Sequence, residues 1–177
     1  MRFYTRKETI NPSTYNINLK NMDLKYFKNL IKKAENLGEE PEFYGKVDQS
    51  EIKQVESALD LKFDKELTSY LEEFGGAGIP DSLNTNGIIP QEALSDNLYT
   101  IYGATIYARD NHALPSNYLV LDAEFPDKCW VLECSALDSN PVFAYNCISP
   151  KTESKIYNSF QEYLFTEWEQ FLEEYED

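Results

Sequence analysis

The stretch Asp48–Gly78 reads DQSEIKQVESALDLKFDKELTSYLEEFGGAG and decides the fold. It predicts two short helices joined by a tight connection and closed by glycine. Asp48 and Glu51 stand three residues apart, which is the spacing of a capping box. Val47 and Ile52 stand where a hydrophobic staple closes over such a box. We therefore predict that the first of these helices begins directly after Asp48.

Apolar residues recur at helical spacing on both predicted helices. Asp64 can cap the second helix, and Leu61 and Phe63 are expected to point inward from the connection. Gly75 and Gly76 end the second helix, because a left-handed residue is readily accommodated there only if it is glycine. The buried stripes are predicted to be Ile52, Val55, Ala58 and Leu59 on the first helix, and Leu67, Tyr70, Leu71 and Phe74 on the second.

Two further helices are predicted near the ends of the chain. Asn21 can cap the first of them and Gly38 can stop it, with residues 39–46 as a linker to the next helix. Ser159 and Glu162 form a second capping box before the last helix. The apolar stripes are Leu24, Phe27, Leu30, Ile31, Ala34 and Leu37 on the N-terminal helix, and Phe160, Leu164, Trp168, Phe171, Leu172 and Tyr175 on the C-terminal one.

The region between the third and the last predicted helix favours strands. Short β-rich segments bounded by turn residues predict strands at 87–89, 98–102, 118–121, 129–133 and 141–145. Residues 104–111 suit a short helix, although their β-branched and aromatic residues also suit a strand. Residues 1–20 suit either an extra strand or a loose arm. Helices at both ends of an antiparallel sheet of about four to six strands give an α+β domain.

These helix and turn motifs, in this order, resemble the SMI1/KNR4 (SUKH) superfamily, whose members typically start with a helix that carries an internal Glu, here Glu56. The family's connection of the type LG-x-x-LP corresponds to residues 59–64. Its helix end, an aromatic followed by GG, corresponds to FGG at residues 74–76. The chain departs from the pattern where Phe63 and Asp64 replace Leu-Pro. Asp64 can cap the helix that proline would have opened, so the fold tolerates the change.

The resemblance continues in the second half of the chain. The family tends to show a Leu-Pro before a strand, then a hairpin, then a helix of the form SF-x-E-[FY]-L. Here LPSNYLVLDAE spans Leu114–Glu124 and contains the predicted strand 118–121, and SFQEYL occupies residues 159–164. The matching region runs over roughly residues 47–172, and residues 1–45 lie mostly outside it.

The charge balance is strongly acidic. There are 31 Asp and Glu against 16 Lys and Arg, which gives a net charge of −15. Such a chain would repel phosphates, which argues against a nucleic-acid partner. It would attract a basic protein, although the acidic excess can equally serve solubility alone. The 13 Tyr, 10 Phe and 2 Trp can fill a core and also supply contact surface.

Residue types suited to catalysis or metal binding are few. His112 is the single histidine, and a surface or loop histidine is favoured over a lone base beside Asp110. The three cysteines, Cys129, Cys134 and Cys147, form no CxxC pair and are read as reduced core residues. A metal site at Cys129 and Cys134 is disfavoured, because residues at that spacing on a strand point to opposite faces.

Sequence signatures of enzymes are absent: no GxSxG, HExxH, P-loop or GxGxxG pattern occurs. The glycines at 75–78 follow a helix, whereas a phosphate cradle opens one. Pro126-Asp127 and Glu133 resemble part of the PD…(D/E)xK nuclease pattern, but Ser135 stands where its lysine would be. We therefore predict no enzymatic activity, no cofactor and no metal. Without a signal peptide or an apolar run of about 18 residues, the expected location is the cytoplasm, without membrane partners.

The resemblance implies a binding protein rather than an enzyme. Many bacterial members are immunity proteins that neutralise a cognate polymorphic toxin, often a nuclease or deaminase, while fungal members act in cell-wall and signalling regulation. We expect one globular unit, with an N-terminal extension and helix at 1–45 and a SUKH-like domain at 46–177. It would block a basic toxin effector domain sterically and electrostatically. The alternative is a regulatory or scaffold protein of the same family without a toxin partner.

The expected partner-binding residues lie mostly in loops, which usually carry recognition. Their acids suit either a solvated surface or a toxin-binding surface, and the same holds for Glu162, Glu169, Glu173 and Glu176 on the last helix. The aromatic candidates for partner contact, Tyr107 among them, can contribute to binding only where their side chains face outward. The predicted partner-binding set is Asp81, Glu92, Asp96, Tyr99, Tyr102, Asp122 and Glu124.

Overall fold

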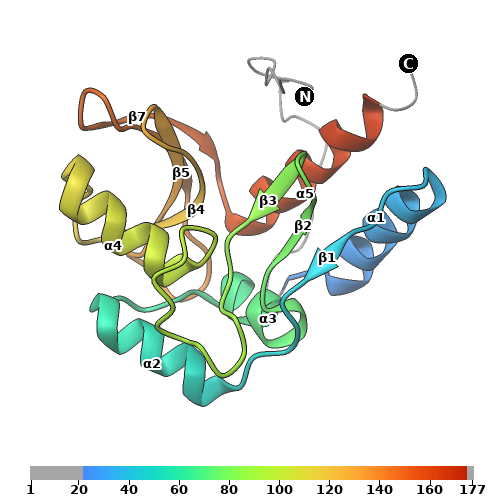
Figure 1. The fold of residues 1–177 in the computed structure, drawn as a ribbon, viewed down its shortest axis with the longest axis horizontal. Coiled ribbons are helices and arrows are strands. Elements are labelled where there is room, and N and C mark those ends of the chain that lie inside the picture. The colour runs from blue at the N-terminus through green and yellow to red at the C-terminus, as the bar shows by residue number, and fades with distance from the viewer. Residues whose placement is uncertain (1–21, 175–177) are drawn as a thin grey trace.

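The computed structural model describes residues 22–174, which form five helices and two antiparallel sheets (Figure 1). The helices are α1 (Leu24–Asn36), α2 (Gln49–Leu59), α3 (Lys65–Phe74), α4 (Ile101–His112) and α5 (Phe160–Glu173). The three-stranded sheet, in the order β1-β2-β3, contains β1 (Glu42–Phe43), β2 (Ala77–Ile79) and β3 (Leu83–Thr85). The four-stranded sheet is a meander of β4 (Tyr118–Glu124), β5 (Lys128–Glu133), β6 (Val142–Asn146) and β7 (Lys151–Tyr157). The expected α+β class and antiparallel strand pairing are confirmed.

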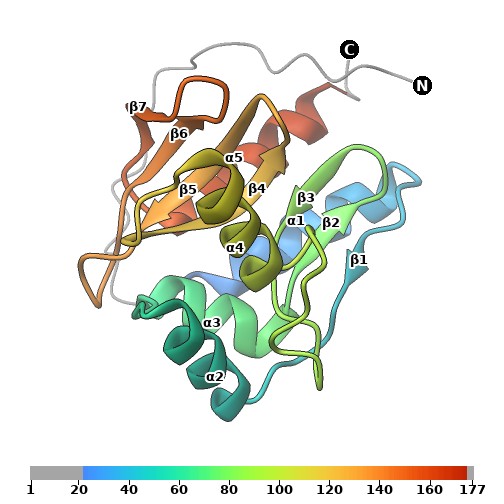
Figure 2. The same cartoon turned by 60° about the vertical axis from the view of Figure 1, so that its left-hand side comes forward.

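The four-stranded sheet lies between α4 on one side and α5 on the other (Figure 2). On the α4 side, Val120 and Val131 pack with Ala104 and Ala108 in a small core cluster. On the other side, sheet residues such as Leu121 join the larger core cluster together with α5. Because both faces are covered, β5 has an unbroken run of buried residues instead of an alternating pattern.

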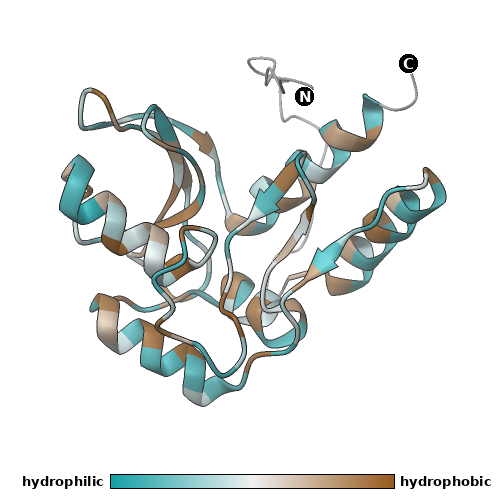
Figure 3. Ribbon diagram, in the orientation of Figure 1, coloured by the Kyte–Doolittle hydropathy of each residue, from teal (hydrophilic) through white to brown (hydrophobic). Residues whose placement is uncertain are grey.

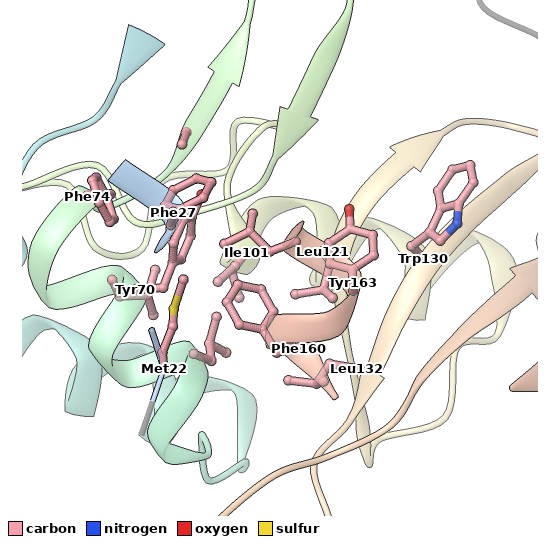
Figure 4. Packing of buried hydrophobic residues seen from close by; sticks show 14 of the residues in the cluster. Met22, Phe27, Tyr70, Phe74, Ile101, Leu121, Trp130, Leu132, Phe160 and Tyr163 are labelled. Carbon is pink, nitrogen blue, oxygen red and sulfur yellow. The ribbon is translucent and has the colours of Figure 1, made fainter. Parts of the chain in front are cut away.

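The larger core cluster joins α1, α2, α3 and α5. Figure 4 shows Phe27, Tyr70 and Phe160 close together between α3 and α5. Phe27 lies at the centre, with its ring 5.1 Å from the rings of both Phe74 and Trp168. Figure 3 shows hydrophobic and hydrophilic residues interleaved along these helices, as expected for helices with one face on a core.

The capping predictions for α2 and α3 are confirmed. The Glu51 carboxylate accepts a hydrogen bond from the Asp48 N–H at 3.3 Å, and Asp64 accepts one from the Leu67 N–H at 2.9 Å. Gly75 has the predicted positive φ of +70°. The predicted stripes are buried except at Ala58, which is exposed: α2 lies at the surface and presents to the core only Ile52, Val55 and Leu59.

The predictions for the N-terminal region need three corrections. Asp23 caps α1, two residues after the predicted Asn21, which lies outside the described residues together with residues 1–20. The predicted linker contains β1, because residues 42–43 pair with residues 77–78 of β2. Leu37 is exposed rather than buried, since it is the C-cap residue beyond the last buried turn.

The predicted strands at 87–89 and 98–102 are wrong. The strands of this region are β2 and β3 instead, and Gly87 makes only an isolated bridge with Thr100. Thr100 caps α4 by accepting a hydrogen bond from the Gly103 N–H at 3.0 Å. Since a cap directs the chain into a helix, α4 begins inside the second predicted strand. The predicted helix at 104–111 is confirmed and is longer at both ends.

The strands at 118–121, 129–133 and 141–145 are confirmed as β4, β5 and β6, with small shifts at their ends. β7 was not predicted, because its residues KTESKIY are mostly polar and exposed at the sheet edge. Ser159 caps α5 as expected, but Glu162 accepts from the Asn158 N–H rather than from Ser159. The predicted stripe of α5 is buried, apart from Tyr175, which lies outside the described residues.

A buried carboxylate joins α3 to the β5–β6 hairpin. The side chain of Asp64 is 0% exposed and accepts a hydrogen bond from Asn140 Nδ2 at 3.0 Å. Burial, together with the nearby Glu66, raises the pKa of Asp64 to about 6, although its hydrogen bonds act in the opposite direction. Folding therefore favours the protonated form of this carboxyl group.

This raised pKa predicts that the free energy of unfolding falls as pH rises. The contribution of Asp64 is fully present below its unfolded pKa near 4 and is lost as pH passes its folded pKa of about 6. A shift of about two pKa units corresponds to at most about 3 kcal/mol. We expect urea unfolding between pH 4 and pH 7 to show a shallower decline for Asp64→Asn than for the unmodified chain. Equal slopes would contradict the prediction, and the change in net charge between the two chains is too small to produce the difference.

Candidate partner-binding site

A hollow of about 170 Å³ opens where β3, the loop 86–100 and the β4–β5 hairpin meet. We call it the Tyr99 hollow. Apolar and aromatic side chains form much of its wall, and two carboxamides and one carboxylate supply its polar groups. Its lining residues are Asn84, Asn86, Leu98, Tyr99, Asp122, Ala123 and Phe125.

The backbone of Tyr99 is held by hydrogen bonds on both sides. Its N–H donates to Asn97 Oδ1 at 2.9 Å, and its carbonyl accepts from the Tyr44 hydroxyl at 3.0 Å. The next residue, Thr100, donates through its hydroxyl to the carbonyls of Ser95 and Asn97. The Tyr99 side chain, which is 63% exposed, therefore projects from a fixed backbone.

The Tyr44 hydroxyl remains a donor over the whole physiological pH range. Burial, followed by the effects of Tyr99 and Glu42, raises the pKa of Tyr44 to about 12. A protonated phenol can keep donating to the Tyr99 carbonyl. The hydrogen bond between the Tyr44 hydroxyl, next to β1, and the Tyr99 carbonyl, in the loop 86–100, is thus independent of ordinary changes in pH.

The far end of the loop is anchored as well. The Glu51 carboxylate of α2 accepts a hydrogen bond from the Gln91 N–H, and Ala93 is buried in the larger core cluster. Glu51 therefore has two roles, because it also completes the capping box of α2. The loop 86–100 is a fixed support for exposed side chains.

Aromatic surface continues from the hollow along α4. The ring of Phe125 lies 4.8 Å from that of Tyr107 and is stacked on His112 at 5.3 Å. His112 is half-buried, and its Nδ1 lies 3.2 Å from the Cys147 carbonyl oxygen. The histidine is thus part of an aromatic stack, and Tyr107 is exposed beside it.

The structure brings Tyr99 and Asp122 of the predicted set together in the hollow. Glu92 and Asp96 are exposed elsewhere in the loop 86–100. Glu124 is exposed at the end of β4, next to Phe125 in the chain. Asp81 is exposed in the turn between β2 and β3, outside the hollow.

Tyr102 is half-buried and packs against the larger core cluster, so only part of its side chain is accessible to a partner. Sequence reasoning also missed most of the hollow's other residues. Asn84 and Asn86 lie on and just after β3, which was not predicted, and Leu98 was placed in a strand. Phe125 directly precedes Pro126, a residue type that favours turns, and its place beside a turn is the signal by which the sequence could have identified it.

The acids on α5 serve partly internal roles. Glu169 accepts a hydrogen bond from the Tyr26 hydroxyl of α1, and Glu162 accepts from Asn158. Glu167, which was not singled out, is buried and accepts from the Tyr157 hydroxyl at 2.8 Å. Glu173 is exposed, and Glu176 lies outside the described residues.

The groups considered for catalysis and metal binding are dispersed. Asp127 lies in the β4–β5 turn and Glu133 at the opposite end of β5, so one whole strand separates them. Cys129 lies 3.8 Å, sulfur to sulfur, from Cys147 in the smaller cluster, whereas Cys134 packs against the larger one. Cys129 and Cys134 thus face opposite sides of the sheet, as predicted. Within residues 22–174, no three His, Cys, Asp or Glu side chains converge as a metal site.

A second hollow, of about 420 Å³, lies at the other end of β4. Its lining includes Asn117, Cys134 and the exposed Leu137. Burial raises the pKa of Cys134 to about 12, so its thiol stays protonated and is a poor nucleophile. This hollow contains none of the predicted partner-binding residues.

None of the described helices has the length and apolar character needed to cross a membrane. A family model described as "SUKH_5: SMI1-KNR4 cell-wall" matches residues 27–169. The match starts inside α1 and ends inside α5, so it includes all the strands and all the lining residues of the Tyr99 hollow that the structure describes. No curated protein matches the chain.

Proposed function

The chain belongs to the SMI1-KNR4 family, and we propose that it acts as an immunity protein that binds and neutralises a basic toxin domain of the nuclease or deaminase class. The exposed Tyr99 on its fixed loop carries this proposal. An aromatic side chain held in place before binding loses little conformational freedom on association, which is the property of an interface hot spot. Acids in the same loop and at the end of β4 favour a basic partner.

In the proposed mechanism the immunity protein binds without turnover. The aromatic surface formed by Tyr99, Phe125 and Tyr107 would be desolvated against the toxin and set the lifetime of the complex. The net charge of −15 would speed encounter with a basic surface. The bound protein would cover the toxin's active site or its substrate path. We place this interaction in the cytoplasm, where a nuclease or deaminase would act.

The proposal is tested with any candidate toxin domain that is found encoded beside this gene. Co-expression should protect cells from the toxin, and the two proteins should co-purify. Tyr99→Ala should weaken the complex, while Ile148→Ala, at an exposed apolar residue in the turn after β6, should not. A chain that neither protects cells nor captures a neighbouring toxin domain would instead favour the regulatory or scaffold role.

Association with such a toxin is expected to depend on salt. The on-rate should fall about tenfold or more as the Debye length shrinks from above to well below ~10 Å, while the off-rate changes less. Neutralising Asp96 and Glu124 should slow association more than neutralising Glu173 and Glu174, which are also exposed. Stopped-flow measurements at several salt concentrations decide this. An on-rate that does not vary with salt would mean that the acidic excess serves solubility alone.

A further inference from the structure

The Tyr99 hollow combines aromatic walls with negative charge. Leu98, Tyr99 and Phe125 supply the apolar surface, and among the described lining residues Asp122 is the one that carries a charge. The hollow therefore offers a cation an attractive field. Aromatic faces add to this attraction, because their π-electrons attract cations.

The polar groups on the floor of the hollow are only partly used. Nδ2 of Asn84 donates to Oδ1 of Asn86 at 2.8 Å, so Oδ1 is the atom that Asn84 can present to a ligand. Asn86 is 1% exposed, and its Nδ2 finds no hydrogen-bond partner among the described residues. Buried polar atoms are normally satisfied, so this donor indicates a place where an acceptor arrives from outside.

Asp122 can accept further hydrogen bonds at this place. It lies at the irregularity of β4, where the register with β5 shifts between Val120 and Asp122. Its Oδ1 accepts from the Ala123 N–H at 2.8 Å. A carboxylate has about four lone-pair sites, so a donor from a partner can bind in addition to existing contacts.

We propose that the Tyr99 hollow is a subsite for one arginine residue of the toxin, an inference that rests on the proposed function. The guanidinium would donate to the Asp122 carboxylate and to Oδ1 of Asn84. Its flat face and aliphatic stem would lie against Tyr99 and Phe125. The main-chain carbonyls of the arginine residue are acceptors of the kind that Nδ2 of Asn86 lacks among the described residues. Arginine fits better than lysine, because its planar fork binds a carboxylate with two donors and stacks on aromatic rings.

The subsite can be tested without the toxin. The probe is N-acetyl-arginine amide, titrated into the full-length protein and followed by ¹⁵N NMR. We expect the largest shifts at the amides of Asn84, Asn86 and Ala123, and about tenfold weaker binding for Asp122→Asn. N-acetyl-citrulline amide, which has the same shape without the charge, should give no localised shifts. N-acetyl-lysine amide should bind more weakly than the arginine probe.

Asp127→Asn is the matched control, because Asp127 is an exposed acid in the same hairpin and lies outside the hollow. It removes the same charge and should leave the titration unchanged. Equal losses in Asp122→Asn and Asp127→Asn would overturn the subsite, since they would mean that only the general field attracts the probe. Shifts spread over the surface, or stronger binding of the lysine probe, would also overturn it.

A captured toxin separates this inference from the proposed function. Tyr99→Ala and Asp122→Asn should each weaken that complex about 30-fold or more, as expected for hot-spot positions. If the toxin is captured and neither variant weakens it, the subsite is wrong while the immunity function stands. If no toxin is captured but the arginine probe binds at Asn84 and Ala123, the subsite stands and the proposed function fails.

Discussion

Gly87→Ala is expected to lower the free energy of unfolding by about 4 kcal/mol or more, or to prevent folding altogether. A Cβ at this position would stand 1.8 Å from the Gly75 carbonyl oxygen and 2.5 Å from Gly76 Cα. Both are backbone atoms and cannot rotate away. The backbone at Gly87 thus passes directly over the backbone at Gly75 and Gly76. Hydrogen bonds fix this backbone crossing: Ile88 N–H donates to the Gly75 carbonyl at 2.7 Å, and Ile101 N–H donates to the Gly87 carbonyl at 2.8 Å.

The control for this change is Gly38→Ala. Gly38 has a φ of +89° and nothing within 4 Å of an added Cβ, so alanine there tests backbone conformation without collision. That variant should lose about 1–2 kcal/mol. Urea unfolding followed by circular dichroism compares the two. A loss for Gly87→Ala no greater than that for Gly38→Ala would mean that the backbone crossing can open at little cost.

Phe74→Ala is expected to lower the free energy of unfolding by about 3–5 kcal/mol. Phe74 is 7% exposed, and its ring meets Phe27 edge-on at 5.1 Å, with Tyr70 at 5.9 Å. Truncation removes these contacts and leaves a cavity that rigid neighbouring rings do not fill. Urea unfolding measures the loss.

Phe43→Ala provides the comparison for Phe74→Ala. The Phe43 ring packs against that of Phe74 at 5.8 Å, but the residue is 40% exposed. The space left by its truncation is open to solvent, so the free energy of unfolding should fall by less than about 1.5 kcal/mol. If Phe74→Ala lost less than about 1 kcal/mol, Phe74 would lie outside the tightly packed part of the core.

The sequence predicted the helical part of the fold well, because caps and stripes are local signals. Asp64 and Ser159 cap α3 and α5 where expected, since a cap needs only its own side chain and the amide three residues on. The strands of the four-stranded sheet were predicted where apolar residues are dense. β7 was missed because its exposed residues carry no such density.

The region around the candidate site could not be predicted in the same way. β2 and β3 have three residues each. They are strands only because they pair with each other and because β1 pairs with β2. Loop residues 86–100 are positioned by Glu51 and Tyr44, which are distant in sequence. Tyr99 and Asp122 were identified individually, but their meeting with Asn84 and Phe125 follows from tertiary structure alone.

The small core cluster under α4 has a consequence for how the molecule opens. α4 buries Ala104 and Ala108 in that cluster and adds Ile101 to the larger one, whereas α5 buries several large residues, Tyr163 and Trp168 among them. Free energies of local opening scale with the apolar contacts that are broken, so α4 should detach from the sheet more readily than α5. Amide protons of α4 would then exchange with solvent through partial opening, at times when α5 remains protected. α4 begins at Ile101, two residues after Tyr99. The proposed contact surface around Tyr99 therefore lies beside the less firmly held of the two helices that cover this sheet.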